Sequence, residues 1–477
     1  MITSLGGQKT FAVAELCHKA QVGEPLWIGV AGSSEISHNM RDDIYWETYY
    51  NSHRPFNSLV NKTEASKESA ILFLKLEELI EIFMNVQKWT EVFHGIVSNT
   101  LSCVDLCELG NTEGVLSDSL QLIRAQIHLP SPLISPRDSE FVRYCHKISD
   151  GAWCIVDFSL NWFSSHRLPY LRKRPSGCLI REMPNGYCKV TWVEHVEVAG
   201  EVVHDICKPL FSAGLAYGAR RWLVALLHNC QRLPTAFSAL NFGVSLEGRR
   251  SFLSLTSRLV KTFCSTFGAS ALGTSWQKLP PTPGEYIAYM VKKNNSDPGA
   301  PLGVILSASI SIFVPVTLNM AFDYIRDVNS RPQWDALCWQ GLVQQLASIP
   351  TGSEPGNCAS IMSVGDGGPG SGNMMIVQES RIDSTGGYLV YVPMDVVAVN
   401  RVVQGQDSRT VVVLPSGFSL LPACRGAQNG GGCLLTVAFQ FLIATSNIPA
   451  SEASLELAEK LVVTTAQNVC NGMLSGL

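Results

Sequence analysis

The sequence repeats one order of landmarks in two stretches that lie roughly 240 residues apart. In each copy a Trp precedes a Pro-Ser-Gly triplet, which precedes an Asn-Gly pair. The landmarks are Trp89, Pro175-Ser176-Gly177 and Asn185-Gly186 in the first copy, and Trp334, Pro415-Ser416-Gly417 and Asn429-Gly430 in the second. The Trp and the Ser are 87 residues apart in one copy and 82 in the other, and each copy closes with an amphipathic helical pattern. One fold is therefore predicted to occur twice.

The length of the chain also predicts more than one domain, because 477 residues exceed what a single hydrophobic core usually supports. Hydrophobic residues make up 46% of the chain, charged residues 16%, and the formal net charge is -4, which is typical of a soluble globular protein. Binding of nucleic acid by surface charge requires clustered Lys and Arg, and basic runs are few and short. We therefore expect no direct DNA binding by this chain.

A segment rich in turn-forming residues separates the two copies. Pro, Gly, Asn and Asp recur across residues 280–302 without apolar periodicity, which indicates a linker. We predict a first domain at residues 8–279 and a second at 303–477. The apolar run Leu302 to Leu318 alternates like a strand and is too short for a membrane helix, so we predict no transmembrane segment.

The hydrophobic patterns predict an α+β fold in which strands are grouped and helices lie at the ends of each half. Helical spacing occurs at Ala12 to Ala20, Ser69 to Trp89, Pro209 to Cys230 and Gly248 to Phe267. Strand patterns occur at Gly151 to Leu160, Ser176 to Arg181 and Tyr187 to Val198, with Asn185-Gly186 as a hairpin turn. The apolar stripe of Gly248 to Phe267 is expected to lie on the first sheet.

The cysteines indicate a reducing compartment. All 15 occur without a Cys-x-x-Cys pair, which favours buried free thiols over disulfides or a metal site, including at Cys103 and Cys107. Residues 1–10 lack the basic segment and apolar core of a secretory signal. We therefore expect no metal ion in this protein.

Several motifs are distributed along both halves of the sequence. Those of the first half are Ala14-Glu15-Leu16, Gly23 to Trp27, Gly177 to Tyr187, Lys189 to His195 and Arg220-Arg221-Trp222. Those of the second half are Phe322 to Asp327, Gln333-Trp334-Asp335, Asp383 to Asp395 and Leu414 to Phe418. The first set resembles the START lipid-transfer domain of plant class IV homeodomain-leucine-zipper transcription factors, and the second set resembles their START-associated domain. The motifs keep the family's order and cover nearly the whole chain.

The resemblance implies two helix-grip domains, each with a curved antiparallel sheet packed on a C-terminal helix. It also implies a cavity for one lipid or sterol in the first domain, a role in transcription, and a nuclear location, with the cytoplasm as the alternative. The family carries a homeodomain and a leucine zipper before the START region. This sequence shows neither a basic recognition helix nor sustained heptads, so direct DNA binding and zipper dimerisation are not carried over.

Strand parity predicts which residues line such a cavity. Along the strand at 188–198, Trp192 is taken to point inward, and Glu194 then lies among apolar neighbours and needs a partner, for which Arg124 or Arg143 would serve. The candidate lining residues are Arg124, Arg143, Trp153, Val156, Phe158, Val190, Trp192, Glu194, Leu255, Leu259 and Phe263.

Plainer interpretations of these residues stay open. The aromatic residues Trp192 and Phe263 would equally fill a solid core, and Glu194 with His195 would form a solvated or satisfied edge pair. The basic residues Arg167, Arg172, Lys173 and Arg174 are expected to be a solvated loop, with contact to lipid phosphates as the alternative.

No catalytic signature is present. A Gly-x-Ser-x-Gly elbow, His-Glu-x-x-His, a phosphate-binding loop and a dinucleotide fingerprint are all lacking, so we predict no enzymatic activity and no cofactor. The predicted function is binding of a hydrophobic small molecule and control of transcription through protein partners or a homo-oligomer. The alternatives are a scaffold or dimerisation module with a filled core, and a soluble lipid-transfer protein.

Overall fold

The computed structural model describes residues 2–29, 38–53, 62–106, 117–160, 170–199, 203–237, 244–268, 276–278, 286–338, 342–365, 374–423, 431–444 and 451–475. The chain forms two compact units. Unit 1 comprises Met1–Leu129, Ser135–Val203 and Phe211–Cys230, and unit 2 comprises Pro130–Ile134, His204–Leu210 and Gln231–Leu477. Among the described residues, no helix has the length and apolar character needed to span a membrane.

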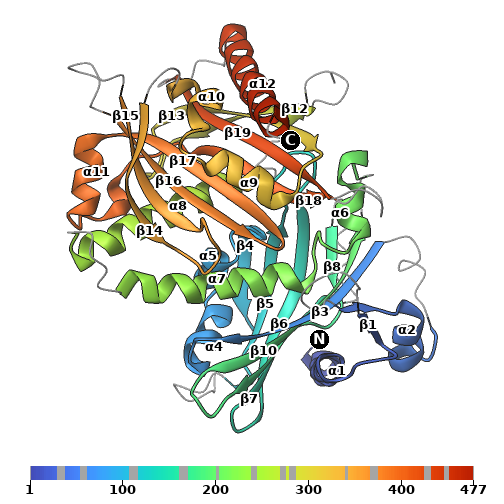
Figure 1. Ribbon diagram of the computed structural model, residues 1–477. Helices are drawn as coiled ribbons and strands as arrows, with labels where there is room; N and C mark the ends of the chain where they lie inside the picture. The colour runs from blue at the N-terminus through green and yellow to red at the C-terminus, as the bar shows by residue number, and fades with distance from the viewer. Residues whose placement is uncertain are drawn as a thin grey trace. The chain divides into compact units, whose positions relative to one another are not determined.

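Unit 1 is built on a 10-stranded sheet with the order β1-β2-β3-β10-β9-β7-β6-β5-β4, in which β8 pairs with both β10 and β6 (Figure 1). All the pairings are antiparallel except that of β6 with β8. The strands are β1 (Trp27–Gly29), β2 (His38–Met40), β3 (Lys62–Leu72), β4 (Val97–Asp105), β5 (Leu120–Ile127), β6 (Arg137–Ser149), β7 (Ala152–Phe158), β8 (Tyr170–Lys173), β9 (Ser176–Glu182) and β10 (Cys188–Ala199).

Helices pack on both faces of the first sheet. The outer face is covered by α1 (Ile2–Gln21), which contacts β7, β9 and β10, and by α2 (Asp42–Tyr50). The inner face carries the side chains that meet α4 (Leu76–Met84), α5 (Val86–Val92) and α7 (Ala219–Phe237). Helix α7 follows the short helices η1 (Asp205–Cys207) and α6 (Lys208–Ser212).

Unit 2 is built on a 9-stranded antiparallel sheet with the order β11-β12-β13-β19-β18-β17-β16-β15-β14. The strands are β11 (Gln277–Lys278), β12 (Tyr286–Asn294), β13 (Gly303–Val314), β14 (Leu342–Pro350), β15 (Cys358–Gly365), β16 (Met374–Asp383), β17 (Gly386–Asp395), β18 (Ser416–Ala423) and β19 (Gly432–Ala444).

The two faces of the second sheet have separate cores. One face packs against α9 (Leu318–Arg326), α10 (Arg331–Trp334) and the C-terminal helix α12 (Glu452–Ser475). The other packs against α8 (Leu246–Thr266) and α11 (Val396–Val403). The short helices η3 (Ala336–Cys338) and η4 (Ser408–Thr410) complete the unit.

The predicted repeat is confirmed by the strand order. In unit 1 the central order is β3-β10-β9-β7-β6-β5-β4, and in unit 2 it is β13-β19-β18-β17-β16-β15-β14, so that each strand has a counterpart at the same place. The Pro-Ser-Gly triplets open the equivalent strands β9 and β18. Trp89 and Trp334 are both buried in a helix that follows the first strand of each series.

A close backbone approach explains the repeated glycine. A Cβ added at Gly177 would lie 2.1 Å from the Ile155 carbonyl oxygen, and one added at Gly417 would lie 2.3 Å from that of Leu389. Real Cβ atoms do not come so near to a backbone oxygen, so only glycine fits at these two positions. The same close contact between neighbouring strands, β9 with β7 and β18 with β17, therefore requires glycine in both units.

The predicted α+β class with antiparallel sheets is confirmed, but three predicted segments differ. Residues 69–72, expected to be helical, belong to β3, and the helices begin only at Leu76. The expected linker at 280–302 contains β12, which pairs with β13 along its whole length. The predicted Asn429-Gly430 turn is not one of the three, because it lies outside the described residues.

The third difference concerns the helix at 246–266, α8, which was expected on the first sheet. Its apolar stripe packs instead on β16 and β17 of unit 2. The boundary between the compact units accordingly falls within α7, after Cys230, rather than at residue 279.

Candidate functional site

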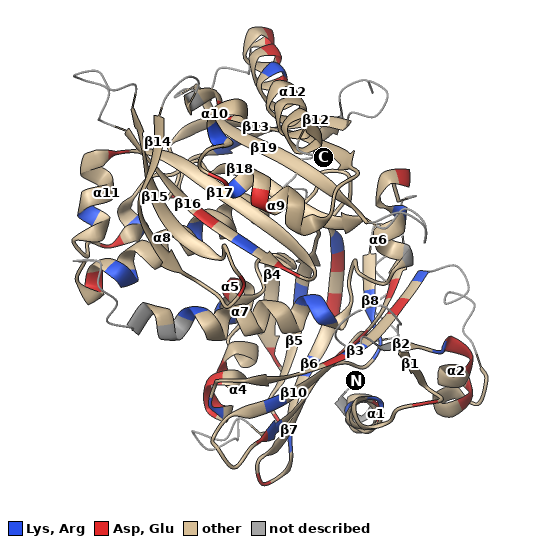
Figure 2. Ribbon diagram, viewed as in Figure 1, with Lys and Arg blue, Asp and Glu red and all other residues tan. Residues whose placement is uncertain are grey.

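The inner face of the first sheet collects aromatic and charged side chains from several strands. Cross-strand partners point to the same side of a sheet, and Trp192 is paired through Cys178 with Ile155. Alternation then puts Val190, Trp192 and Glu194 of β10 on the face that also carries Phe141 and Arg143 of β6 and Asp157 of β7. Charged residues of both signs lie along strands of this sheet (Figure 2).

Six aromatic rings form a continuous group on this face, which we call the aromatic cluster. Its members are Phe83, Trp89, Phe93, Phe141, Trp192 and Trp222. Trp222 of α7 stacks on Trp192 with 5.3 Å between ring centroids and on Trp89 with 6.1 Å. None of the six is more than 2% exposed. Helix α7 is therefore held on the first sheet by the indole of Trp222.

Four charged residues lie beside the aromatic cluster, and we call them the ion cluster. Arg143 donates from Nε and Nη2 to the two carboxylate oxygens of Asp157, at 2.8 and 2.9 Å. The ammonium group of Lys173 lies 2.9 Å from Glu194 Oε1 and 3.5 Å from Asp157 Oδ2. Trp192 donates its indole N–H to Glu194 Oε2 at 3.0 Å. The cluster is thus a chain of alternating charges away from water.

Burial raises the pKa of the two carboxyl groups of the ion cluster, and the neighbouring positive charges lower it. Burial raises the pKa of the Glu194 carboxyl, and Lys173 and the Trp192 N–H offset only part of that rise. Burial also raises the pKa of the Asp157 carboxyl, but Arg143 and Lys173 outweigh it and leave that pKa below its usual value. Asp157 is therefore the firmly ionised member of the pair.

A second polar group lies where β6 begins, and we call its four residues the polar end. They are Glu64 of β3, Arg137 and Ser139 of β6, and Tyr217, which precedes α7. Glu64 Oε2 accepts the backbone N–H of Tyr217 at 2.9 Å. Burial raises the pKa of the Glu64 carboxyl to about 7, although the N–H of Tyr217 and the charges of Lys62 and Arg221 lower it.

The outer face of the sheet holds a different set of residues. Val156 and Phe158 pack there against Leu16, Trp27 and Tyr45 of the N-terminal segment. His195 also faces outward, with its ring edge-on to that of Tyr45 at 4.5 Å, and burial with nearby Lys19 and Arg174 puts the pKa of the His195 imidazole far below its usual range.

The structure brings together only part of the predicted lining. Arg143, Val190, Trp192 and Glu194 share the inner face, and Trp153 lies half-buried on the same face at the other end of β7. Val156 and Phe158 alternate onto the outer face, so they do not line the same interior. Arg124 does not line the interior either, since its side chain is 43% exposed and its Nη2 lies 3.9 Å from Asp138 Oδ2.

Three candidates belong to the other unit. Leu255, Leu259 and Phe263 are buried in the core that α8 forms with the second sheet. The amphipathic stripe correctly indicated a helix on a sheet, but the stripe carries no information on which sheet it covers.

The predicted partner of Glu194 and the predicted solvated residues also need correction. Lys173, rather than Arg124 or Arg143, neutralises Glu194. Glu194 is 2% exposed and His195 1%, so neither forms a solvated edge. Lys173 and Arg174, expected in a solvated loop, are 1% and 6% exposed, and Arg174 pairs with Glu197. Arg167 lies outside the described residues.

Sequence reasoning missed Asp157, Lys173 and Trp222 as parts of the inner face, as well as the polar end. Alternation along β7 would have found Asp157, because it is the polar residue in an otherwise apolar strand. No local signal separates Lys173 from the basic residues before it.

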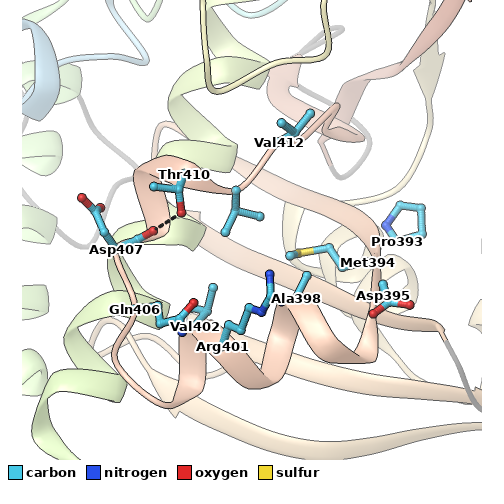
Figure 3. A pocket seen from close by; sticks show the side chains of 11 residues that line it. Pro393, Met394, Asp395, Ala398, Arg401, Val402, Gln406, Asp407, Thr410 and Val412 are labelled. Atoms are coloured by element: carbon cyan, nitrogen blue, oxygen red, sulfur yellow. Dashed lines mark hydrogen bonds between the residues drawn. The ribbon is translucent and has the colours of Figure 1, made fainter.

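Unit 2 contains an open pocket of about 400 Å³ between the end of β17, α11 and η4 (Figure 3). Met394, Val402 and Val411 contribute apolar surface. Its two carboxylates are already engaged, because Asp395 accepts the N–H of Val397 and Asp407 accepts that of Arg409. The two carboxylates of this pocket thus serve as helix caps.

Among the residues that the structure describes, no group of three or more His, Cys, Asp and Glu is arranged to hold a metal ion. The 13 described cysteines are free thiols.

Two protein-family models match the chain. The START domain model matches residues 9–232, and the model "PDF2-like, C-terminal domain" matches residues 245–474. The START match ends within α7 at residue 232, close to the unit boundary, which follows Cys230.

Named relatives match over both units. Homeobox-leucine zipper protein ROC8 of Oryza sativa subsp. japonica is 36% identical over 96% of this chain and 69% of its own length. Homeobox-leucine zipper proteins HDG3 and HDG12 of Arabidopsis thaliana are 35% and 36% identical over 96% of this chain, and over 63% and 67% of their own lengths. The chain thus spans about two thirds of the length of these relatives.

Solved structures show a more distant likeness. Human StAR-related lipid transfer protein 5 matches 48% of this chain and 99% of its own at 15% identity, with a TM-score of 0.32. The di-domain ARO/CYC BexL matches 86% of this chain and 97% of its own at 9% identity, with a TM-score of 0.22.

Proposed function

Because the chain belongs to the plant homeobox-leucine zipper family, class IV, whose START domain is followed by a PDF2-like C-terminal domain, we propose that unit 1 binds a hydrophobic small molecule and that binding regulates transcription. The ligand is a lipid or a sterol, the protein acts in the nucleus, and it carries out binding rather than catalysis. Its regulatory effect passes through protein partners.

The observation that carries the proposal is the charge buried on the inner face of the first sheet. A core that serves stability alone gains little from ions, because removing two charges from water costs as much as their attraction returns. Unit 1 nevertheless places Arg143, Asp157, Lys173 and Glu194 there, each at most 3% exposed. Polar groups in an apolar interior are what orients a ligand in a typical binding site.

Helix α7 would transmit ligand binding to protein partners. Trp222 joins it to the aromatic cluster, so a ligand in this interior would contact the helix as well as the sheet. A ligand that binds only when α7 lies on the sheet stabilises that arrangement by its difference in affinity for the two states. Partners that recognise the outer surface of α7 would then respond to the ligand.

Affinity selection tests the binding step. The purified full chain is incubated with a mixed plant-lipid extract, separated from free lipid, and its bound lipids are identified by mass spectrometry. We expect one lipid class to be enriched, and enrichment to be lost in Trp222→Ala but kept in Trp276→Ala. Trp276 packs against the core between α8 and the second sheet, so its loss alters unit 2. Recovery of no lipid above an unrelated control protein would overturn the proposal.

The regulatory step is tested in plant cells. A fluorescent fusion reports location, and a fusion to an unrelated DNA-binding domain reports control of a matching promoter. We expect nuclear signal and a change in promoter activity that Trp222→Ala reduces. Equal promoter activity with and without the chain would contradict the transcriptional role.

The aromatic cluster favours a second candidate, a scaffold with a filled interior. Rings that stack with centroids 5 to 6 Å apart and are almost fully buried are also what a solid core contains. A scaffold would bind partners equally well with and without lipid. Pull-down of partners by lipid-free and lipid-loaded protein therefore separates the two candidates.

A further inference from the structure

The polar end contains several buried polar atoms without a hydrogen-bond partner. They are Glu64 Oε1, Arg137 Nε and Nη1, and Ser139 Oγ, and the Tyr217 hydroxyl beside them has no partner other than Arg137. The four residues are at most 5% exposed, so bulk water does not reach them. Native proteins pair nearly all buried polar atoms, and each exception calls for an explanation. Four such atoms in one group leave hydrogen-bonding capacity that a bound polar group would satisfy.

The chain directs these atoms toward the same interior. Arg137, Ser139 and Phe141 occupy every second position of β6, so their side chains share one face of the sheet. Phe141 belongs to the aromatic cluster, so this face is the inner one. Glu64 lies on β3 opposite Val196 of the inner face, and it accepts the backbone N–H of Tyr217. Burial raises the pKa of the Tyr217 hydroxyl to about 12, the charge of Glu64 adds to the rise, and Arg137 lowers it by its charge and by donating a hydrogen bond to the hydroxyl oxygen.

The balance of charge and donors at the polar end favours an anion. Arg137 is a permanent cation with unpartnered N–H groups, and the two hydroxyl groups of Ser139 and Tyr217 donate as well. Arg221 adds a second cation near Glu64, with its own N–H groups bonded to the carbonyl oxygens of Ala216 and Gly95. Glu64 is the single acid of the group, and its burial favours the neutral form.

We propose that the polar end is an oxyanion site, in which Arg137, Ser139 and Tyr217 donate hydrogen bonds to a phosphate-type group. This inference rests on the proposed function, because the group would be the head of the amphiphile that unit 1 binds. Guanidinium and hydroxyl donors are the groups that proteins use for phosphate. A free phosphate ion has the same chemistry, and the experiment distinguishes the two sources.

Isothermal titration calorimetry of the full chain provides the test with three probes: decyl phosphate, decanol and inorganic phosphate. We expect decyl phosphate to bind at least about tenfold more tightly than decanol, the factor that one charge-assisted hydrogen bond provides. Tyr217→Phe and Ser139→Ala should each weaken decyl phosphate by about fivefold to tenfold and leave decanol unchanged. Arg137→Gln should abolish the preference.

Matched controls exclude a general loss of structure. Arg124→Gln removes an exposed arginine from the neighbouring strand, and Tyr187→Phe removes an exposed hydroxyl, so both should bind like the wild type. If Arg137→Gln fails to fold, the two hydroxyl deletions keep the test intact, because Ser139 Oγ has no partner in the unliganded protein and the Tyr217 hydroxyl, which accepts from Arg137, donates to no protein group there.

Each remaining outcome has a definite meaning. Equal affinity for decyl phosphate and decanol would overturn the oxyanion site and leave the proposed function standing. Binding of inorganic phosphate as tight as that of decyl phosphate, without decanol binding, would support the oxyanion site and count against a lipid ligand. If none of the three probes binds, both proposals fall.

Discussion

Replacing Lys173 by Met should destabilise unit 1 by leaving Glu194 as an unpaired buried carboxylate. Asp157 keeps both bonds from Arg143 in this variant, and Glu194 keeps only the indole N–H of Trp192. Lys173 and Glu194 are 1% and 2% exposed, so water cannot replace the lost partner. Breaking a buried ion pair on one side costs about 3–5 kcal/mol, and we expect a loss of that size at pH 8.

The pH dependence provides an internal check on the cause. Loss of the ammonium group raises the pKa of Glu194 further above its unfolded value, so the carboxylate destabilises the fold at high pH. The penalty is relieved as the pH falls through the folded pKa toward the unfolded one. The deficit of Lys173→Met relative to wild type should therefore be smaller at pH 5.5 than at pH 8.

Urea unfolding followed by tryptophan fluorescence measures these differences, because three of the tryptophans lie in the aromatic cluster. The double variant Lys173→Met/Glu194→Gln should recover at least about half of the loss, since the unpaired charge is gone. Lys147→Met, which removes an exposed lysine, should leave stability nearly unchanged. A single variant within about 1 kcal/mol of wild type, or a double variant no better than the single, would refute the reasoning.

Three further predictions follow from local geometry. Gly177→Ala and Gly417→Ala should each lower the free energy of unfolding by about 3 kcal/mol or more, whereas Gly23→Ala, which meets open space, should have little effect in the same urea titration. Ser245→Ala should cost about 1 kcal/mol, because the serine side chain caps α8 by accepting the N–H of Gly248, and a drop in the melting temperature reports it. Burial lowers the pKa of His128 from 6.5 to about 3, so the neutral form contributes stability that is lost as the pH falls from 6.5 toward 3. His128→Gln should accordingly remove about 2 kcal/mol from the fall in stability that the wild type shows between pH 7.5 and 5, to which His195 also contributes, and an unchanged slope would contradict this assignment.

The sequence predicts the face on which a strand residue lies, but it does not predict which charged residues meet on that face. Alternation placed Trp192 and Glu194 on one face of β10, because side-chain direction in a strand is a local property. The partner of Glu194 depends on how β8 pairs with β10, where Lys173 lies opposite Val196. That register is set by contacts between segments far apart along the chain, and the basic residues around Lys173 look alike in the sequence.

The sequence alone determined that one fold occurs twice, that it is α+β, and which glycines and tryptophans mark equivalent positions. These conclusions follow from spacing and periodicity, which neighbouring residues encode. Only the tertiary structure decided that α8 covers the second sheet, that Val156 and Phe158 face away from Trp192, and that Glu64 of the inner face bonds the backbone N–H of Tyr217. An amphipathic pattern states that an element has an apolar side, and the choice of the surface that buries it depends on chain topology.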